Sequence, residues 1–234
     1  GMGVGLKHAL AYDNHPHTML KAICDFDYKK TQQLKRRFNG VSIFNDDQFI
    51  FNDKDINIVS IASYDNWHSD QIIQAIRNEK HVMAEKPLCL NRDELNKIYL
   101  EQKKTNKVKI SANHVLRTNS RFIRFKNDII DGKFGDVFFL EGDYYWGRKN
   151  KLYGWRAEMD YYSIILGAAI HMIDLVMWLL DSKPISIQAL GNNISTKESK
   201  LKYNSFAIII LKFDNGIIAK LTGNGGCVFP HFHG

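Results

Sequence analysis

Two short motifs in this chain hold residues that can move protons. The first is Glu85-Lys86-Pro87, and the second places His171 and Asp174 three residues apart in an otherwise apolar run. Residues three apart share one face of a helix, so the imidazole and the carboxylate are expected close together. Histidine titrates near neutral pH and can accept a substrate proton, which makes the lysine and the histidine a candidate proton-relay pair.

Each motif also has an ordinary structural interpretation. A lysine after a strand is usually a surface residue, and a histidine in an apolar helix is commonly a core residue satisfied by a helix neighbour. Burying both His171 and Asp174 without a purpose would nevertheless be costly. Asp174 can orient His171, pair with Lys86 or accept a sugar hydroxyl, and the sequence leaves these three roles open.

The elements that must position these residues follow two patterns. Up to about residue 113, helices and strands alternate as in a doubly wound sheet. We predict helices over 6–12, 29–38, 69–78 and 92–105, and strands over 18–24, 56–62, 81–84 and 108–112. The later pattern predicts a helix over 120–131, a long helix around His171, and strands over 136–145, 185–190, 206–213 and 217–221, the last two joined by the hairpin turn Asp214-Asn215-Gly216. The fold class is therefore α/β, with a Rossmann-like dinucleotide-binding domain over 1–113 and an α+β domain with a mostly antiparallel or mixed sheet over 114–234.

Glycines and an acidic residue in the first domain suit a dinucleotide. Gly1, Gly3 and Gly5 precede a helix, whose N-terminus offers free amides and a positive dipole end to a pyrophosphate. Asp25 ends the next strand about twenty residues later, where a carboxylate accepts hydrogen bonds from ribose hydroxyls. The residues 26–28 contain no arginine to receive a 2′-phosphate, which favours NAD and leaves NADP as the alternative. The ordinary interpretations are a flexible or cloning-derived start and an aspartate that caps a turn.

Together the dinucleotide pattern, Glu85-Lys86-Pro87 and His171 with Asp174 resemble the Gfo/Idh/MocA family of nicotinamide-dependent sugar oxidoreductases, the glucose–fructose oxidoreductase and inositol dehydrogenase group. The resemblance spans essentially the whole chain. It implies hydride transfer between a sugar, polyol or sugar-nucleotide hydroxyl and the cofactor. Lys86 would then polarise the oxygen, His171 would be the acid/base, and Asp174 the orienting or binding carboxylate.

The same resemblance implies a set of ligand contacts. The implied cofactor contacts are Gly1, Gly3, Gly5, Asp25, Ser63, Asn66, His68, Glu85, Lys86 and Arg117. The implied substrate contacts are Lys86, Trp155, Arg156, His171 and Asp174. Arginine forks suit phosphate or carboxylate, and tryptophan faces suit sugar rings, although a surface ion pair or a core aromatic is the alternative for each.

The chain departs from the family at three places. Gly167 stands four residues before His171, where many family dehydrogenases carry Asp or Asn. A doubly wound fold has a central first strand that delivers the glycine turn, and this chain shows none. The segment 227–233 resembles a mid-domain part of the family, so several strands of the second sheet are expected to be missing. The alternatives are a start further upstream, a segment from another subunit, or a degraded relative that acts as a non-catalytic binding or assembly protein.

Composition and charge narrow the classes of partner, metal site and cellular location that the sequence allows. The net charge is +7, but lysines are dispersed among acids, so we expect no nucleic-acid partner. Three scattered cysteines argue against disulfides and a cysteine-based zinc site, and His231 with His233 lack further metal ligands. The apolar stretch 164–180 is interrupted by polar residues, which favours a buried helix over a membrane span. We expect a cytoplasmic protein with a sugar-like small-molecule substrate, no bound metal, and homo-oligomer contacts, dimeric or tetrameric, through the second sheet.

Overall fold

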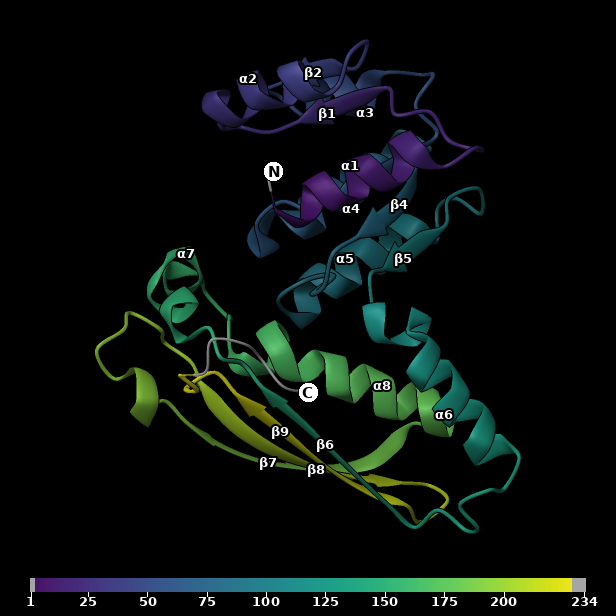
Figure 1. The fold of residues 1–234 in the computed structure, drawn as a ribbon, viewed down its shortest axis with the longest axis vertical. Helices are drawn as coiled ribbons and strands as arrows, with labels where there is room; N and C mark the ends of the chain where they lie inside the picture. The colour runs from purple at the N-terminus through teal and green to yellow at the C-terminus, as the bar shows by residue number, and fades with distance from the viewer. Residues whose placement is uncertain (1–2, 229–234) are drawn as a thin grey trace. The chain divides into compact units, whose positions relative to one another are not determined.

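The computed structural model describes residues 3–228, and the chain divides into two compact units, Gly1–Asn113 and His114–Gly234 (Figure 1). Each unit is described by itself. In the first unit the elements are α1 (Val4–Asn14), β1 (Ala22–Cys24), α2 (Tyr28–Arg37), β2 (Ser42–Phe44), α3 (Gln48–Asn52), β3 (Ile58–Ile61), η1 (Asp65–Trp67), α4 (His68–Arg77), β4 (His81–Ala84), α5 (Arg92–Gln102) and β5 (Ile110–Ala112). The predicted alternation of helices and strands is confirmed. The sequence did not predict β2 and α3, which are too short to show a period.

The strands of the first unit form two separate parallel sheets. β1 pairs with β2, whereas β3, β4 and β5 form a second sheet in that order. In a doubly wound dinucleotide fold one further strand lies between the strands that correspond to β1 and β3. Among residues 3–228, no strand precedes β1.

Helix α1 lies between these two sheets (Figure 1). On one side its Ala9 packs with Leu34 and Phe38 in an apolar cluster that also includes side chains of β1 and β2. On the other side a Cβ at Gly5 would lie 3.5 Å from the Cβ of Ala62, just after β3. The helix thus contacts both sheets where no strand joins them.

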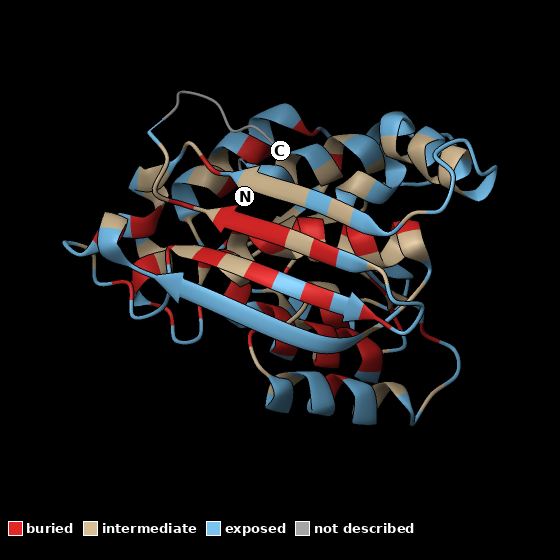
Figure 2. Cartoon of the chain, turned by 90° about the horizontal axis from the view of Figure 1, so that it is seen from below, coloured by how far each residue is buried: buried red, intermediate tan, exposed pale blue. Residues whose placement is uncertain are grey.

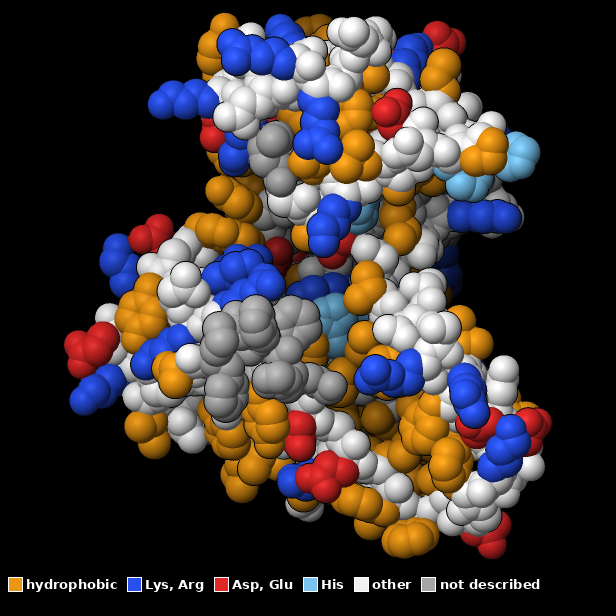
Figure 3. Space-filling view, viewed as in Figure 1, with side chains coloured by type: hydrophobic (Ala, Val, Ile, Leu, Met, Phe, Trp, Pro, Cys, Tyr) orange, Lys and Arg blue, Asp and Glu red, His pale blue; other side chains and the backbone are white. Residues whose placement is uncertain are grey.

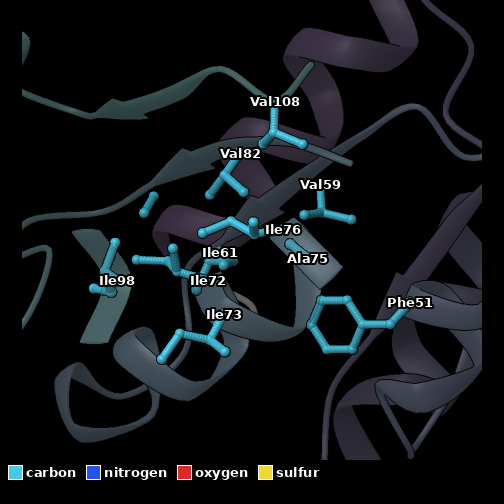
Figure 4. Close-up of a cluster of buried hydrophobic side chains, with 11 residues drawn as sticks. Phe51, Val59, Ile61, Ile72, Ile73, Ala75, Ile76, Val82, Ile98 and Val108 are labelled. Carbon is cyan, nitrogen blue, oxygen red and sulfur yellow. The ribbon is translucent and has the colours of Figure 1, made fainter. Parts of the chain in front are cut away.

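A second apolar cluster holds β3 and β4 in place (Figure 4). Helix α4 contributes Ile72, Ala75 and Ile76, whose side chains are 0 to 2% exposed, against Val59 and Val82 of the two strands. Each fully buried isoleucine contributes about 1.5–3 kcal/mol through the hydrophobic effect. This packing fixes the carboxyl ends of β3 and β4, after which Ser63 and Lys86 follow.

The second unit has one mixed sheet covered by helices on one face. Its elements are η2 (Val115–Thr118), α6 (Ser120–Ile130), β6 (Phe139–Tyr145), η3 (Lys149–Tyr153), α7 (Trp155–Glu158), η4 (Ile165–Ala169), α8 (Ile170–Leu180), β7 (Pro184–Asn192), η5 (Ile194–Thr196), β8 (Phe206–Phe213) and β9 (Ile218–Asn224). The sheet order is β6-β9-β8-β7, with β6 parallel to β9 and the other pairs antiparallel, which confirms the predicted mixed sheet. The predicted hairpin after Phe213 is also confirmed, and Gly216 takes a positive φ of 86° there.

Helix α8 is fixed to this sheet by one apolar stripe. Its buried residues Met172, Leu175, Val176 and Leu179 repeat at helical spacing and pack on β8 and β9. The opposite face of the sheet is open, and β7 is exposed along nearly its whole length (Figure 2). Among residues 3–228, the structure contains no helix with the length and apolar character needed to cross a membrane.

Candidate active site

Lys86 stands directly after β4 in a segment that is held from two sides. The backbone amide of Glu85 donates to the carbonyl of Ile61 at 2.8 Å, which continues the pairing of β4 with β3. The next residue, Pro87, follows a cis peptide bond and is buried. Its carbonyl oxygen lies 2.7 Å from Nδ1 of the fully buried His68. Lys86 itself is half-buried, at the carboxyl end of a parallel strand, where α/β folds bind their ligands.

Glu85 is the centre of a polar network that sequence reasoning missed. Its Oε1 lies 2.9 Å from Nε2 of His8 on α1 and accepts from the Asn113 amide at 2.7 Å. The other ring nitrogen of His8 is hydrogen-bonded to Ser60 Oγ on β3. Burial raises the pKa of Glu85, but hydrogen bonds from His8 and Asn113, with the charges of His8 and Lys86, outweigh it and bring the pKa below its ordinary value. The network therefore ties α1, β3, β4 and β5 together beside Lys86.

The lowered pKa of Glu85 predicts a loss of stability in acid. A carboxylate with a depressed folded-state pKa adds stability that is fully present above its unfolded pKa of 4.5 and is lost as the pH falls through the folded value. Glu85→Gln should therefore lower the free energy of unfolding by about 1–3 kcal/mol at pH 6. At pH 3.5 the difference from the unmodified chain should be much smaller.

Urea denaturation at the two pH values measures this difference. Glu79→Gln is the matched control, because its carboxylate is 63% exposed and pairs with Lys107 only at the surface. An equal loss for Glu85→Gln at pH 6 and pH 3.5 would show that its charge does not contribute.

The glycine and aspartate positions fit a dinucleotide in part. Gly1 lies outside the described residues. Helix α1 begins at Val4, so Gly3 is its N-cap. Gly5 lies within the first turn of the helix, whereas we had predicted it to lie before the helix. A Cβ at Gly3 would meet nothing within 4 Å. Asp25 follows β1 as predicted, 8% exposed, and its Oδ1 accepts from the amide of Asp27 at 2.9 Å. The amides of a helix N-terminus and a carboxylate at a strand end are donors and acceptors that suit pyrophosphate and ribose.

The loop after β3 contains three residues that the sequence named. Ser63 Oγ donates to Oε1 of Gln71 at 2.6 Å, and Asn66 is exposed in η1. His68 differs from the expectation, because it is 0% exposed and its ring is used on the Pro87 carbonyl. Its position allows it to hold the segment after Lys86 and leaves no surface for contact with a ligand.

His171 lies in the first turn of α8 and is 9% exposed. Its ring stacks on Tyr144 of β6, with centroids 5.4 Å apart and an interplanar angle of 20°. Burial raises the pKa of Tyr144, with Arg148 acting in the opposite direction, so this ring is a neutral phenol at physiological pH. The stack fixes the plane of the imidazole against the sheet.

Asp174 is engaged by an arginine from η2. Arg117 donates from Nε to Oδ2 at 2.8 Å and from Nη2 to Oδ1 at 2.6 Å, a bidentate pair, and His114 Nδ1 lies 3.6 Å from Oδ2. The Asp174 side chain is 11% exposed and that of Arg117 is 45% exposed. Through its hydrogen bonds and charge Asp174 raises the pKa of Arg117, against a smaller effect of burial. The predicted cofactor contact Arg117 and the predicted catalytic Asp174 thus form one charge pair.

Trp155 and Arg156 open the short helix α7, which was not predicted as a helix. The guanidinium carbon of Arg156 lies 4.0 Å from the Trp155 ring centroid and 6.0 Å from those of Trp146 and Tyr162. Arginine that rests on aromatic faces is held by cation–π attraction. The two predicted substrate contacts therefore belong to one aromatic cluster around a cation.

Gly167 lies in a π-helical turn, η4, that leads directly into α8. Its backbone conformation is open to any residue, but a Cβ there would overlap the hydroxyl of Tyr162 and lie 2.7 Å from its ring carbon Cζ. Tyr162 is 1% exposed, so its ring can move only if its close-packed neighbours also shift. The glycine is required by this contact.

Gly167→Ala should therefore destabilise the second unit. Overpacking a buried site costs about 1–3 kcal/mol, which exceeds the roughly 1 kcal/mol that alanine gains over glycine in a helix. We expect a net loss of about 1–2 kcal/mol in thermal or urea unfolding. Gly154→Ala is the control, since a Cβ there meets nothing within 4 Å. An unchanged midpoint for Gly167→Ala would show that Tyr162 moves freely.

Several residues of these sites were not predicted. They are His8, Ser60, Asn113, His114, Tyr144 and Tyr162. Asn113 and His114 directly follow a predicted strand, so the rule that ligands bind at the carboxyl ends of parallel strands points to them. His8, Ser60, Tyr144 and Tyr162 meet their partners only in the folded chain, and no local sequence pattern predicts such contacts. Within residues 3–228 no group of three or more His, Cys, Asp or Glu could hold a metal ion, and His231 and His233 lie outside that range.

Comparisons with known proteins find similar sequences. The chain is 24% identical over 161 residues to an inositol 2-dehydrogenase of Salmonella typhimurium, which covers 68% of this chain and 46% of the relative. It is 27% identical over 213 residues to a glucose-6-phosphate 3-dehydrogenase of Bacillus subtilis, covering 85% of this chain and 58% of the relative. The chain thus spans about half the length of these curated relatives.

Solved structures show the same fold. The crystal structure of scyllo-inositol dehydrogenase from Lactobacillus casei with bound cofactor NAD(H) and scyllo-inositol superposes with a TM-score of 0.83 at 20% identity, over 95% of this chain and 66% of that one. The family model described as "Oxidoreductase family, NAD-binding Rossmann fold" matches residues 1–114. A second model, "GFO/IDH/MocA C-terminal domain", matches residues 122–231. Because the two models follow one another along nearly the entire chain, the chain belongs to the Gfo/Idh/MocA oxidoreductase family.

Proposed function

We propose that the protein is an NAD-dependent dehydrogenase that transfers a hydride between a hydroxyl of a sugar, cyclic polyol or sugar nucleotide and a nicotinamide. The observation that carries the proposal is Lys86, held after β4 by the Glu85 network and by Pro87, in a unit that matches an NAD-binding Rossmann family model. The relatives named inositol 2-dehydrogenase and glucose-6-phosphate 3-dehydrogenase support a cyclic, polyhydroxylated substrate.

The cofactor is proposed to be held by groups of the first unit. The N-terminus of α1 would take the pyrophosphate, and Asp25 would take a ribose hydroxyl. Residues 26–28 contain no arginine for a 2′-phosphate, so we propose NAD as the preferred form. When bound, the nicotinamide supplies the acceptor for the hydride that leaves the substrate carbon.

The protein's own residues handle the proton and the oxygen charge. The ammonium of Lys86 would stabilise negative charge on the reacting oxygen. The imidazole of His171, its plane fixed by Tyr144, would accept the hydroxyl proton during oxidation and return it during reduction. Asp174, held by Arg117, would accept hydrogen bonds from neighbouring substrate hydroxyls through the carboxylate lone pairs that Arg117 does not use. Arg156, resting on Trp155, would contact a sugar ring or an anionic group on it.

A titration with NADH tests the cofactor site first. Tryptophan-to-nicotinamide energy transfer should report micromolar binding that favours NADH over NADPH. Asp25→Ala should weaken NADH binding, whereas Asp13→Ala, an exposed position on α1, should leave it unchanged. Once NADH binding is shown, inositols, hexoses and sugar nucleotides should be screened as substrates by following the reduction of NAD.

A non-catalytic binding or assembly role is the second candidate. No NADH binding at millimolar concentration would favour this role and overturn the dehydrogenase proposal.

We also propose that a second copy of the chain packs on the open face of the C-terminal sheet. This face carries Phe139, Ile210 and Ile218, each 42 to 43% exposed, and Leu190, which is 81% exposed. Lys220 and Glu141 pair on the same face. Hydrophobic side chains also gather along the lower border of Figure 3, whereas the Lys and Arg side chains on that view are scattered. An exposed apolar sheet face of this kind marks an interaction surface.

The oligomeric state provides the check. Sedimentation should show a dimer or tetramer that Ile210→Glu dissociates to monomers, because a charge would be buried in the contact. Lys197→Glu, on an exposed turn away from the sheet, should not change the state. A monomer at all concentrations would exclude this interface.

A further inference from the structure

Positive side chains gather where strand β6 leads into helix α7. Residues 144–157 contain no acidic side chain, and their cationic side chains are Arg148, Lys149, Lys151 and Arg156. We refer to three of these as the cation cluster: Arg148, Lys151 and Arg156. The Nζ of Lys151 lies 5.9 Å from the ring centroid of the buried Trp146, and the guanidinium carbon of Arg156 lies 6.0 Å from the same centroid. Both distances are within the range at which an aromatic ring attracts a cation.

The two short helices that carry Lys151 and Arg156 are fixed by buried residues. Lys151 lies in η3, whose Leu152 is 0% exposed and accepts a hydrogen bond at its carbonyl oxygen from the Ser199 hydroxyl. Arg156 lies in α7, whose Ala157 is 1% exposed. Lys151 and Arg156 are themselves half-buried, so part of each remains open to a ligand.

Among residues 3–228, no carboxylate compensates the charges of Lys151 and Arg156. Neither side chain forms an ion pair there, and the next acid along the chain, Glu158, pairs with Lys200 at 3.0 Å. Burial lowers the pKa of Lys151, and the positive charges of Arg156 and Arg148 lower it further. The cluster therefore repels itself in the folded chain. Unfavourable charge placement of this kind is frequent at functional sites, and a ligand of opposite sign relieves it.

The cation cluster lies close to the proposed acid/base. The pairing of β6 with β9 continues to Trp146, whose amide donates to the carbonyl of Asn224 at 2.7 Å. Tyr144 and Trp146 are two residues apart in extended backbone, so their side chains share one face, about 7 Å apart along the strand. Tyr144 is the ring on which His171 stacks, and the charge of Arg148 acts on its phenol. A substrate at the imidazole can thus reach the cluster with a group further along its ring.

We propose that the cation cluster binds an anionic group of the substrate, a phosphate or a carboxylate, so that the substrate is a negatively charged sugar or polyol. The inference rests on the proposed function, because it assigns the cluster to the substrate of His171. Arg156, held 4.0 Å from the Trp155 ring centroid, presents a planar fork to two oxygens of the anion, and Lys151 adds a point charge. An uncharged sugar leaves the repulsion in place, so the cluster discriminates against it.

Tryptophan fluorescence of the full chain without cofactor tests the site itself, because two of the cations lie against Trp146. Inorganic phosphate and acetate are titrated at an ionic strength held constant with sodium chloride, and at least one of them should give a saturable change. Lys151→Gln should weaken that binding roughly tenfold to a hundredfold, the effect of losing one hydrogen bond to a charged group. Lys197→Gln is the matched control, because it removes the same charge from a side chain that is 77% exposed, and it should bind the anion unchanged.

Calorimetry with glucose 6-phosphate, glucuronate and glucose distinguishes the two sources of the anion. At least one charged sugar should bind tenfold or more tightly than glucose, and the tighter of the two identifies phosphate or carboxylate as the preferred group. The preference should be lost in Lys151→Gln and kept in Lys197→Gln. Thermal unfolding checks the fold of the variants, and the midpoint of Lys151→Gln should not fall, because the substitution removes repulsion from Arg148 and Arg156.

Three results would overturn the inference. They are the lack of a saturable response to either inorganic anion, equal weakening in the Lys197→Gln control, and three sugars that bind alike or not at all. Equal weakening in the control would show attraction by net charge alone. None of these titrations needs NADH, so a chain that binds a charged sugar but not NADH would refute the dehydrogenase proposal and keep the anion site. A chain that binds NADH but no anion would refute this inference alone.

Discussion

Lys86→Ala should abolish turnover while NADH binding stays close to that of the unmodified chain. The ammonium is the group expected to stabilise oxygen charge as the hydride moves, and loss of one such group lowers kcat by about 10²–10³-fold or more. The surrounding fold should persist, because Glu85 and Pro87 are held by their own contacts with His8, Asn113 and His68. Steady-state NAD reduction and NADH energy transfer measure the two effects on the same sample.

Lys109→Ala is the control for this experiment, since that lysine is exposed and stands just before β5, at the opposite end of the strand from its carboxyl end. Lys86→Arg is informative as well, because a guanidinium retains the charge but not the shape of an ammonium. Turnover that survives Lys86→Ala would remove Lys86 from the mechanism.

His171→Asn should lower kcat by about 10²–10⁴-fold, the usual contribution of a general acid/base. The dependence of the remaining rate on pH should lose the limb that reports the imidazole. NADH binding should be retained, because the cofactor groups proposed above lie in the first unit. A pH–rate profile of the variant and of the unmodified chain, at saturating NAD, measures both changes.

The alternative for His171 is a core histidine whose role is packing. That alternative predicts a fall in stability, through loss of the stack on Tyr144, with kcat nearly unchanged for the folded fraction. Thermal unfolding of the same variant separates the two, and His17→Asn, an exposed position, is the control. The contacts of Asp174 already weigh against the packing alternative, because its hydrogen bonds within residues 3–228 go to Arg117 and not to His171.

Long elements with clear periods could be predicted from the sequence, and short ones could not. Helix α8 and strand β8 follow apolar stripes, so their existence and their place in the core were predictable. The strand predicted over 18–24 extends only over Ala22–Cys24, because its partner β2 offers three residues for pairing. The π-helical turn η4 was not predicted, since its residues are as apolar as those of a regular helix.

The candidate site was predictable in its residues more than in its contacts. Lys86, His171 and Asp174 stand in motifs that local reasoning detects. The pairs that fix them join residues far apart along the chain: 77 residues separate His8 from Glu85, and 57 separate Arg117 from Asp174. Charge alone allows many such pairs, and only the packed fold selects one. For the same reason the sequence suggested His171, Lys86 or a sugar hydroxyl as the partner of Asp174, and not Arg117.

The split of the first unit has a consequence for how it unfolds. Two apolar clusters, one around Leu34 and the other around Ile72, belong to two different sheets, and α1 contacts both. Cooperativity between the halves then depends on such bridging contacts, among them the link from His8 to Glu85. A ligand that binds at the N-terminus of α1 would stabilise the native state by mass action. Because α1 contacts both clusters, we expect such a ligand to oppose separate opening of the two sheets, so that local opening and cofactor occupancy are linked in this unit.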